Sequence, residues 1–434
     1  MENVKRLLPS ARTRQTDQLA RRLVLGQLRR LEKGILRIQE PSGTIELGRP
    51  ADDGLEAELV IHDSSVWRDM VTGGSIGAAE AYVAGDWESP DLVALLRFFA
   101  RNIDRMNEFE DRFAWLSKPA LKGLHWLNRN SETGSRKNIR AHYDLGNELF
   151  ERFLDPTMMY SAAIFPDEDS SLEEASRYKL DRICQKLDLQ PGDRVIEIGT
   201  GWGGFALHAA REYGCHVTTT TISSEQFDWV QQRVREEGLG DQIELLFEDY
   251  RALEGQYDKL VSIEMIEAVG PQYLDSYLRQ IGQLIKPDGL ALIQAITIPE
   301  QRYRRALRNV DFIQRYIFPG SFIPSVGAIL GAVASETDLV LSHVEDIGFH
   351  YARTLHCWRE NFEAESDRIR ALGYDEAFQR LWRYYFAYCE AGFAERRIGD
   401  AQILFARPDN QRPNLVASGR LTSTGNHHDQ ARHA

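Results

Sequence analysis

The amino-acid sequence predicts an α/β fold, a mostly parallel sheet with helices on both faces, preceded by a smaller α+β domain. Short apolar runs alternate with helical stretches between residues 190 and 300, which is the pattern of repeated βα units. A glycine-rich loop follows the first run, where such a sheet turns from strand into helix. The first hundred residues instead show strand patterns followed by helical ones, which indicates a separate domain.

The expected sheet begins with a β-branched run after the turn pair Pro191-Gly192. Strands are expected at 195–198, 216–222, 243–248, 259–264 and 289–297. Strand-like patterns resume at 338–350 and 401–406, on either side of a long aromatic helix around 382–393. Ligands of such sheets bind beyond the carboxyl ends of the strands. The polar residues expected at those ends are Glu197, Thr221, Asp249, Glu264 and Glu267.

Arginines and leucines interleave over residues 1–30 and predict a basic helix. Two interpretations stay open: an amphipathic helix that touches anionic headgroups, or a solvated helix docked on its own domain. Strands are expected next over 35–47 and 55–61, and then helices over 64–96 with turns at Gly73-Gly74 and Gly85. These elements form the predicted α+β domain.

The weaker periodicity after residue 101 and a polar, glycine-containing stretch set the expected domain boundaries. We expect an N-terminal domain over 1–115, a linker over 116–140, an α/β domain over 141–407 and a disordered tail over 408–434. A cap insertion is expected around 300–335, where aromatic residues surround two prolines. The tail histidines His427 and His428 are read as tail composition and not as metal ligands.

Charge and cysteine content exclude several classes of function. The net charge of −13 argues against a nucleic-acid partner held by a broad basic surface. The four cysteines have neither metal-type nor disulfide-framework spacing, so no metal site is expected and a reducing cytoplasm fits. Charged residues interrupt every apolar run, so we expect no signal peptide and only peripheral contact with a membrane, at its inner face.

The glycine-rich loop indicates the ligand. Gly199, Gly201 and Gly204 satisfy the dinucleotide fingerprint G-x-G-x-x-G, a weak match by itself. Together with Glu197, Gly199, Gly201 and Gly203 also give E-x-G-x-G-x-G, the first motif of class I S-adenosylmethionine-dependent methyltransferases. A carboxylate beside the loop suits a cationic ligand and repels a pyrophosphate. A glycine-rich turn without a ligand is the third interpretation.

The motifs together resemble one family, the cyclopropane-fatty-acyl-phospholipid synthases, relatives of the mycolic acid cyclopropane synthases. The resemblance runs from about Gly77 to Phe405. Its motifs are His142-Tyr-Asp-Leu-Gly-Asn-Glu-Leu-Phe, Met159-Tyr-Ser, Glu197-Ile-Gly-Thr-Gly-Trp-Gly-Gly, Thr221-Ile-Ser-Ser-Glu-Gln, Asp249-Tyr-Arg, Glu264-Met-Ile-Glu-Ala-Val-Gly and Tyr316-Ile-Phe-Pro-Gly. It implies a Rossmann-like class I methyltransferase domain, a lipid-engaging N-terminal domain, and a cyclopropane made on an unsaturated acyl chain of membrane phospholipid. Members are often dimers, so a homodimer is one candidate state.

The resemblance also implies the cofactor contacts. Tyr160 and Ser161 are expected at the methionine end of S-adenosylmethionine. Gly199, Gly201 and Gly203 are expected where the backbone comes close to the cofactor, with Glu197 beside them. Thr221 and Gln226 are expected at the ribose, and Asp249 and Tyr250 at the adenine.

The family holds a bicarbonate ion as its base, using a cysteine, a glutamate, a histidine and a tyrosine. The glutamate corresponds to Glu267 and the tyrosine to Tyr351. The cysteine is replaced by Ala162, the histidine by Gln294 and a further histidine by Ala268. Gln294 can donate a hydrogen bond but carries no charge, and Ala162 can do neither. Bicarbonate binding is therefore an open question.

Several alternatives remain beside a cyclopropane product. The enzyme could be a divergent methyltransferase that makes a methylene or methyl-branched chain, a non-catalytic lipid-binding paralogue, or a nicotinamide-dependent oxidoreductase. Cys389 matches another cysteine often treated as active in the family, although a cysteine in an apolar helix is usually inert core. Glu264 could serve as a helix cap or face solvent, and Tyr351 could be a packed aromatic.

Overall fold

The computed structural model describes residues 11–107 and 145–412. Two compact units appear, each assembled from several stretches. The first unit comprises Met1–Leu154, Thr297–Ser325 and Gly348–Gly399, and the second comprises Asp155–Ile296, Val326–Ile347 and Asp400–Ala434. The expected linker, residues 142–144 of the motif that begins at His142 and the tail beyond residue 412 lie outside the described residues. The expected domain boundaries stay a prediction.

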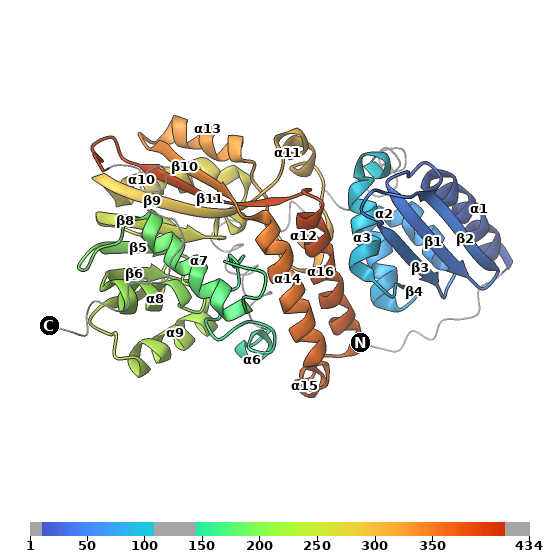
Figure 1. The fold of residues 1–434 in the computed structure, drawn as a ribbon, viewed down its shortest axis with the longest axis horizontal. Coiled ribbons are helices and arrows are strands. Elements are labelled where there is room, and N and C mark those ends of the chain that lie inside the picture. Colours follow the sequence, from blue (N-terminus) through green and yellow to red (C-terminus); the bar gives the residue numbers. More distant parts are fainter. Residues whose placement is uncertain (1–10, 108–144, 413–434) are drawn as a thin grey trace. The chain divides into compact units, whose positions relative to one another are not determined.

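The second unit is built on a seven-stranded sheet with the order β10-β11-β9-β8-β5-β6-β7 (Figure 1). Its strands are β5 (Arg194–Ile198), β6 (His216–Thr220), β7 (Ile243–Leu246), β8 (Tyr257–Ile263), β9 (Ile285–Thr297), β10 (Val340–Asp346) and β11 (Gly399–Ala406). Parallel pairing joins β7, β6, β5, β8 and β9, whereas β10 and β11 pair antiparallel. The predicted α/β class with a mostly parallel sheet is confirmed.

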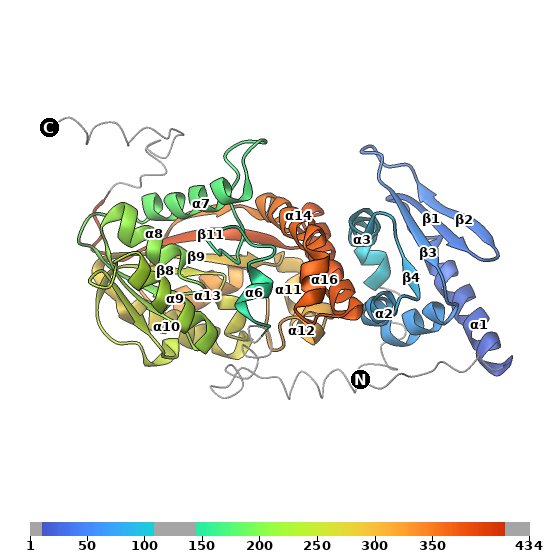
Figure 2. The ribbon, with the colours of Figure 1, turned by 90° about the horizontal axis from the view of Figure 1, so that it is seen from below.

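Helices cover both faces of this sheet (Figure 2). They are α7 (Leu172–Lys186), α8 (Gly204–Tyr213), α9 (Ser224–Glu236), α10 (Leu274–Leu284) and α13 (Val326–Glu336), with the short 3-10 helices η1 (Tyr250–Ala252), η2 (Ile266–Ala268) and η3 (Pro271–Tyr273). A capping box formed by Ser171 and Glu174 begins α7, and the Ser223 side chain caps α9. These caps determine where the two helices begin.

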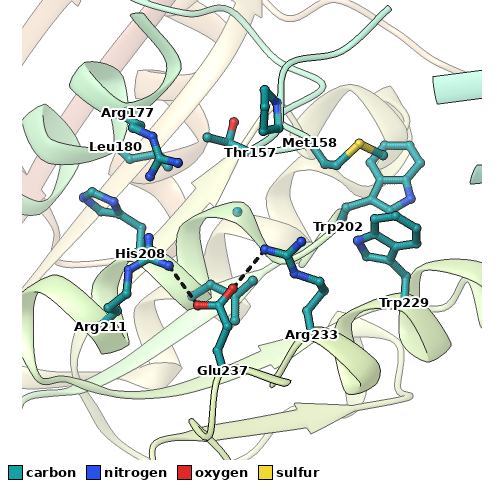
Figure 3. A pocket seen from close by; sticks show the side chains of 13 residues that line it. Thr157, Met158, Arg177, Leu180, Trp202, His208, Arg211, Trp229, Arg233 and Glu237 are labelled. Carbon is teal, nitrogen blue, oxygen red and sulfur yellow. Dashed lines mark hydrogen bonds and ion pairs between the residues drawn. The ribbon is translucent and has the colours of Figure 1, made fainter. Parts of the chain in front are cut away.

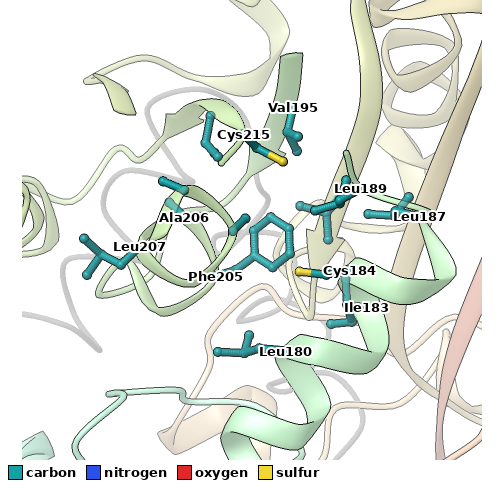
Figure 4. Packing of buried hydrophobic residues seen from close by; sticks show 14 of the residues in the cluster. Leu180, Ile183, Cys184, Leu187, Leu189, Val195, Phe205, Ala206, Leu207 and Cys215 are labelled. Atoms are coloured by element: carbon teal, nitrogen blue, oxygen red, sulfur yellow. The ribbon is translucent and has the colours of Figure 1, made fainter. Parts of the chain in front are cut away.

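One apolar core joins α7, α8 and α9 to the sheet (Figure 4). Phe205 of α8 is buried against residues of α7 such as Ile183 and Cys184, and the strand residues Val195 and Val217 close the cluster. Because side chains alternate along a strand, Glu197 shares the face of Val195 and points toward the same helices.

The first unit contains a four-stranded sheet with the order β2-β1-β3-β4. Its strands are β1 (Gly34–Glu40), β2 (Gly43–Arg49), β3 (Glu56–Ile61) and β4 (Trp87–Glu88), and its first helices are α1 (Ala11–Leu28), α2 (Ser65–Ala84) and α3 (Leu92–Arg101). The expected turns are present: the backbone leaves helical geometry at Gly74, and Gly85 ends α2 in the left-handed conformation. On α1, Val24 and Leu25 are buried while Leu19 and Leu23 are exposed.

The remaining helices of the first unit are α6 (Asn147–Phe150), α11 (Glu300–Ala306), α12 (Phe312–Tyr316), α14 (Gly348–Ala364), α15 (Ser366–Ala371) and α16 (Glu376–Ala394). α16 packs on α14, and Glu395 at its end accepts hydrogen bonds from Arg97 and Arg101 of α3. The stretch expected as a cap, 300–335, supplies α11 and α12 here and α13, which packs on α10, in the second unit. Within the described ranges, no helix has the length and apolar character needed to cross a membrane.

Candidate active site

The glycine loop connects β5 to α8 at the carboxyl edge of the parallel sheet. Gly199, Gly201 and Gly203 all have positive φ, and a Cβ added at Gly201 would meet no atom within 4 Å, so the loop leaves space there. The amide of Thr200 donates to the carbonyl of Thr220 on β6, 2.9 Å away, which holds the loop over the sheet. Since no side chain caps the start of α8, its first amides can donate hydrogen bonds to an anionic group of a ligand.

The segment with Tyr160 and Ser161 lies beside this loop. The ring of Tyr160 meets that of Trp202 edge to face, with centroids 6.3 Å apart. The buried ammonium of Lys179 on α7 donates to the Ser161 hydroxyl at 2.9 Å, and burial lowers the pKa of Lys179 to about 8. The structure therefore brings together two groups of residues that the sequence assigned to one cofactor.

Glu197 does not face the open side of the loop. Its carboxyl group is buried and accepts a hydrogen bond from the Thr219 hydroxyl at 2.6 Å. Burial raises the pKa of Glu197 to about 8, so the group is mostly neutral at pH 7. Its side chain therefore links β5 to β6, and its expected role toward the cofactor stays a prediction.

Two further pairs follow the ends of β6 and β7. The Thr221 hydroxyl donates to the Gln226 side-chain carbonyl at 2.9 Å, and both side chains are buried. Asp249 accepts from the amide of Arg251 at 3.1 Å and so begins η1, while Tyr250 packs edge to face on Tyr277. Both pairs lie at the edge predicted for ribose and adenine, but no contact tests those assignments.

Glu264 follows β8 in a left-handed conformation, φ 49°, that is uncommon outside glycine. Its Oε1 atom accepts from the amide of Ala162 and from the side-chain amide of Gln294, each at 2.8 Å. The NH₂ group of Gln294 also donates to Asp400 Oδ2 at 3.2 Å. The Glu264 carboxylate thus connects its own segment to those of Ala162 and Gln294.

Glu267 lies in η2, one turn beyond Glu264. Its Oε1 atom accepts from the amide of Ile296 at 2.5 Å, whereas Oε2 is buried and has no hydrogen-bond partner among the described residues. Burial, followed by the charge of Glu264, raises the pKa of Glu267 to about 8. A buried carboxyl group with one uncommitted oxygen and a raised pKa is the arrangement of a general base.

Comparison with known proteins identifies the family. The sequence model of the family "Mycolic acid cyclopropane synthetase" matches residues 130–403. This chain belongs to that family. The tuberculostearic acid methyltransferase of Mycobacterium tuberculosis is 38% identical over 362 residues, covering 79% of this chain and 82% of the relative. The cyclopropane-fatty-acyl-phospholipid synthase of Escherichia coli K12 is 36% identical over 352 residues, covering 81% and 88%.

Solved structures of the family agree. A cyclopropane synthase from Mycobacterium tuberculosis is 30% identical with a TM-score of 0.59, covering 62% of this chain and 98% of that chain. A mycolic acid cyclopropane synthase complexed with SAH and CTAB has the same identity, TM-score and coverage. This synthetase-family chain is thus an S-adenosylmethionine-dependent methyltransferase of fatty acyl lipids. The nicotinamide and non-catalytic alternatives are set aside, and the open glycine loop with its uncapped helix fits the methionine carboxylate of the cofactor.

Bicarbonate fits this synthetase-family site poorly. Both donors that Gln294 can offer are directed at carboxyl groups, and its carbonyl accepts from Gln402 at 3.0 Å. The Ile296 amide already donates to Glu267, and Ala162 has no polar side chain. A bicarbonate ion needs hydrogen-bond donors around it. Here the described donors of Gln294 and Ile296 already bond to carboxyl groups.

The other two catalytic candidates belong to the first unit. Tyr351 of α14 is buried and stacks on Phe393 with ring centroids 4.4 Å apart. Cys389 of α16 lies among aromatic residues of its own helix, and burial raises the pKa of its thiol above the ordinary value. A thiol with a raised pKa is a poor nucleophile at neutral pH. Their roles in catalysis stay predictions.

Sequence reasoning missed Asp400 and Lys179, which are both fully buried in the second unit. The signal that could have found them is a charged residue in an otherwise apolar element: Asp400 enters the apolar strand β11, and Lys179 lies on the buried face of α7.

A pocket also opens among α7, α8 and α9, next to Trp202 and Gly204 of the glycine loop (Figure 3). Trp202 and Trp229 line one side, and Arg211 and Arg233 both form ion pairs with Glu237, at 2.8 and 2.9 Å. Arg211 also pairs with Glu212 at 2.8 Å, so two carboxylates balance these two arginines. The candidate active site remains the carboxyl edge of the sheet.

Proposed function

We propose that the protein adds the methyl group of S-adenosylmethionine to the cis double bond of an unsaturated acyl chain in membrane phospholipid and closes a cyclopropane ring. The observation that carries the proposal is the buried carboxyl group of Glu267, with its uncommitted Oε2 atom at the carboxyl edge of the sheet. The 36% identity to a cyclopropane-fatty-acyl-phospholipid synthase supports the product.

When bound, S-adenosylmethionine supplies an electrophilic methyl group on a sulfonium. Methylation of one olefinic carbon leaves a positive charge on its neighbour, and the buried carboxyl groups of Glu264 and Glu267 stabilise that charge. Glu267 Oε2 then takes a proton from the new methyl group. The electrons of the broken C–H bond form the third side of the ring, and the chain becomes neutral.

Glu267 suits this step because its environment is dry. With a pKa of about 8, Glu267 is mostly protonated at pH 7, and its ionised fraction grows as the pH rises toward 8. That ionised fraction accepts a proton from carbon more readily than a carboxylate with the ordinary pKa would. The Ile296 amide fixes the other oxygen and so sets the direction of Oε2. Burial also keeps water from capturing the cationic chain.

We infer that turnover does not depend on bicarbonate, since Glu267 acts directly. The paired donors of Gln294 and the absence of a polar side chain at Ala162 support this.

A second candidate product is a methylene-branched chain. The 38% identical relative named as a methyltransferase favours it, as do the replacements at Ala162 and Gln294. If a hydrogen migrates from the methylated carbon to its neighbour before Glu267 acts, loss of the same methyl proton gives an exocyclic methylene and not a ring. Both products gain one CH₂. A saturated methyl branch would additionally need a two-electron reductant.

Mass spectrometry of the acyl chains decides between them. Purified protein is incubated with S-adenosylmethionine and vesicles of cis-unsaturated phospholipid, with bicarbonate either present or stripped out. A gain of one CH₂ that resists mild hydrogenation as an alkene supports the ring. A product that takes up hydrogen supports the methylene chain, and dependence on bicarbonate would contradict the direct role of Glu267. No product at all would contradict both.

Membrane contact is proposed through α1 on the cytoplasmic side, where the exposed leucines Leu19 and Leu23 adjoin exposed arginines such as Arg22 and Arg29. Binding would be peripheral, and the homodimer expected from the resemblance remains a proposal.

A further inference from the structure

Asp400 is a fully buried acid without an assigned role. It lies at the start of β11, and its Oδ2 atom accepts a hydrogen bond from the same Gln294 nitrogen that donates to Glu264. Its other oxygen, Oδ1, has no hydrogen-bond donor among the described residues. One amide therefore holds two carboxyl groups close together in the interior of the second unit.

Asp400 is fully buried next to the Glu264 carboxyl group, so ionising Asp400 would add repulsion between like charges to the cost of removing its charge from water. The charged groups that face Asp400 are Glu264, Glu267 and the ammonium of Lys179. One cation among three acids leaves the excess negative charge to be cancelled by protons. Burial, followed by the charge of Glu264, raises the pKa of Asp400 well above its usual range.

Glu264 in turn determines the path of the segment at Ala162. The Glu264 carboxylate accepts from the Ala162 amide at 2.8 Å, and Lys179 holds the adjacent Ser161 hydroxyl at 2.9 Å. Glu264 keeps an uncommon left-handed backbone at this point, so the surrounding contacts must hold it there. Whatever fixes the Glu264 side chain therefore fixes the backbone next to Ser161.

We propose that Asp400 is a positioning residue whose protonated carboxyl group donates a hydrogen bond to Glu264, and that this pair fixes the Ser161–Ala162 backbone at the methionine end of the cofactor. The proposal rests on the cofactor site described above. It assigns Asp400 no contact with the reacting atoms. Gln294 donates to both carboxyl groups and so keeps them together.

The chemistry separates two substitutions. In Asp400→Asn the amide can still donate a hydrogen bond to Glu264 without any proton to lose. In Asp400→Ala this donor is absent, so Glu264 loses the hydrogen bond that Asp400 would donate. A merely structural role for a buried acid would make the two variants similarly harmful, whereas a positioning role through a donated hydrogen bond predicts rescue by asparagine.

The experiment measures amide hydrogen exchange at Ala162 in the full-length protein without ligand, together with S-adenosylhomocysteine affinity by titration calorimetry. For Asp400→Ala we expect exchange about 10-fold faster and affinity about 10-fold weaker. For Asp400→Asn we expect both to stay within about 3-fold of wild type. Asp17→Ala, which removes a buried acid held by Arg68 in the first unit, is the matched control and should change neither.

Unchanged exchange in Asp400→Ala would overturn the proposal, and so would equal loss in both variants. Faster exchange with unchanged affinity would overturn it as well, and would locate the error in the cofactor assignment of the segment. If Asp400→Ala does not fold, wild type and Asp400→Asn are compared from pH 6 to 9.5 after correction for intrinsic exchange. Protection that falls with pH in wild type alone supports the hydrogen bond donated by protonated Asp400, and parallel profiles contradict it. None of these readouts depends on which acyl product forms.

Discussion

Two polar clusters hold this molecule together in different ways. In the second unit, the fully buried side chains of Gln294 and Asp400 are joined to each other and to the Glu264 carboxyl group by hydrogen bonds. In the first unit, Arg97 and Arg101 of α3 clasp Glu395 in ion pairs of 2.8 and 2.7 Å that solvent partly reaches. Burial raises the pKa of an acid and so lets it exchange protons near neutral pH, which is useful for chemistry. Partly exposed charges stay ionised and contribute to stability through ion pairs.

The largest expected effect is a loss of catalytic rate on substitution of Glu267, next to the buried cluster. For Glu267→Gln we expect turnover to fall by about 10³-fold, because an amide cannot accept the methyl proton. Cofactor affinity should change by less than about 3-fold, since Glu267 is placed at the acyl chain. The measurements are initial rates and calorimetric titration with S-adenosylhomocysteine. Glu40→Gln, a largely buried glutamate bound by Arg21, is the control; equal loss of rate and affinity in Glu267→Gln would show a role in binding or folding.

The same burial should make stability depend on pH. Glu197 has a pKa of about 8 when folded against an ordinary value of 4.5, so only the unfolded chain ionises it between those values. Stability is therefore greatest below pH 4.5 as far as this group is concerned and falls by up to about 1.4 kcal/mol per pH unit as pH rises toward 8. Urea unfolding at pH 5, 6, 7 and 8 tests this. Glu197→Gln should flatten the slope, and an unchanged slope would refute the assignment.

The stabilisation by the partly exposed cluster around Glu395 should instead depend on salt concentration. Removing one charge in Glu395→Gln leaves two arginines with a weaker partner, and we expect a loss of about 1 kcal/mol in unfolding free energy. That loss should shrink in 1 M NaCl, because screening weakens partly exposed ion pairs. Urea unfolding at low and high salt measures both. A salt-independent loss would mean that Glu395 acts by packing and would remove the contrast between the two clusters.

The smallest expected effect concerns membrane contact. Deleting α1 would also remove the buried Val24 and Leu25, so substitution of its exposed leucines is the sharper test. We expect Leu19→Ser with Leu23→Ser to weaken partitioning onto anionic vesicles about 3-fold to 10-fold in a sedimentation assay. Leu372→Ser, at an exposed leucine after α15, is the control. If both variants partition like wild type, α1 is only docked on its own domain.

Much of this architecture could be predicted because local patterns carry it. The β-branched run at 195–198, the glycine loop and the regular alternation after it identified the parallel sheet and the edge where the site lies. Glu267 could be singled out because a family motif contains it. In the first unit, the breaks in the helical stretch at Gly74 and Gly85 could be predicted from these turn residues.

Other parts could not be predicted, since they depend on tertiary contacts. The sequence did not indicate that the Glu197 carboxyl group is buried and accepts a hydrogen bond from the Thr219 hydroxyl of the neighbouring strand. Asp400 is distant in sequence from Glu264 and belongs to no motif, so only the pairing of β11 within the sheet brings the two together. The division of 300–335 between two units likewise depends on which helix each segment packs against.

The close approach at the start of α8 constrains how this family member can evolve. A Cβ added at Gly204 would lie 2.4 Å from the sulfur of Met159 and 2.9 Å from the carbonyl oxygen of Thr157. An alanine at 204 is therefore tolerable only after the side chain at 159 becomes smaller and the Thr157 backbone shifts. Positions 159 and 204 should covary among homologues, and a larger residue at 204 should be found only in lineages that had already lost the methionine.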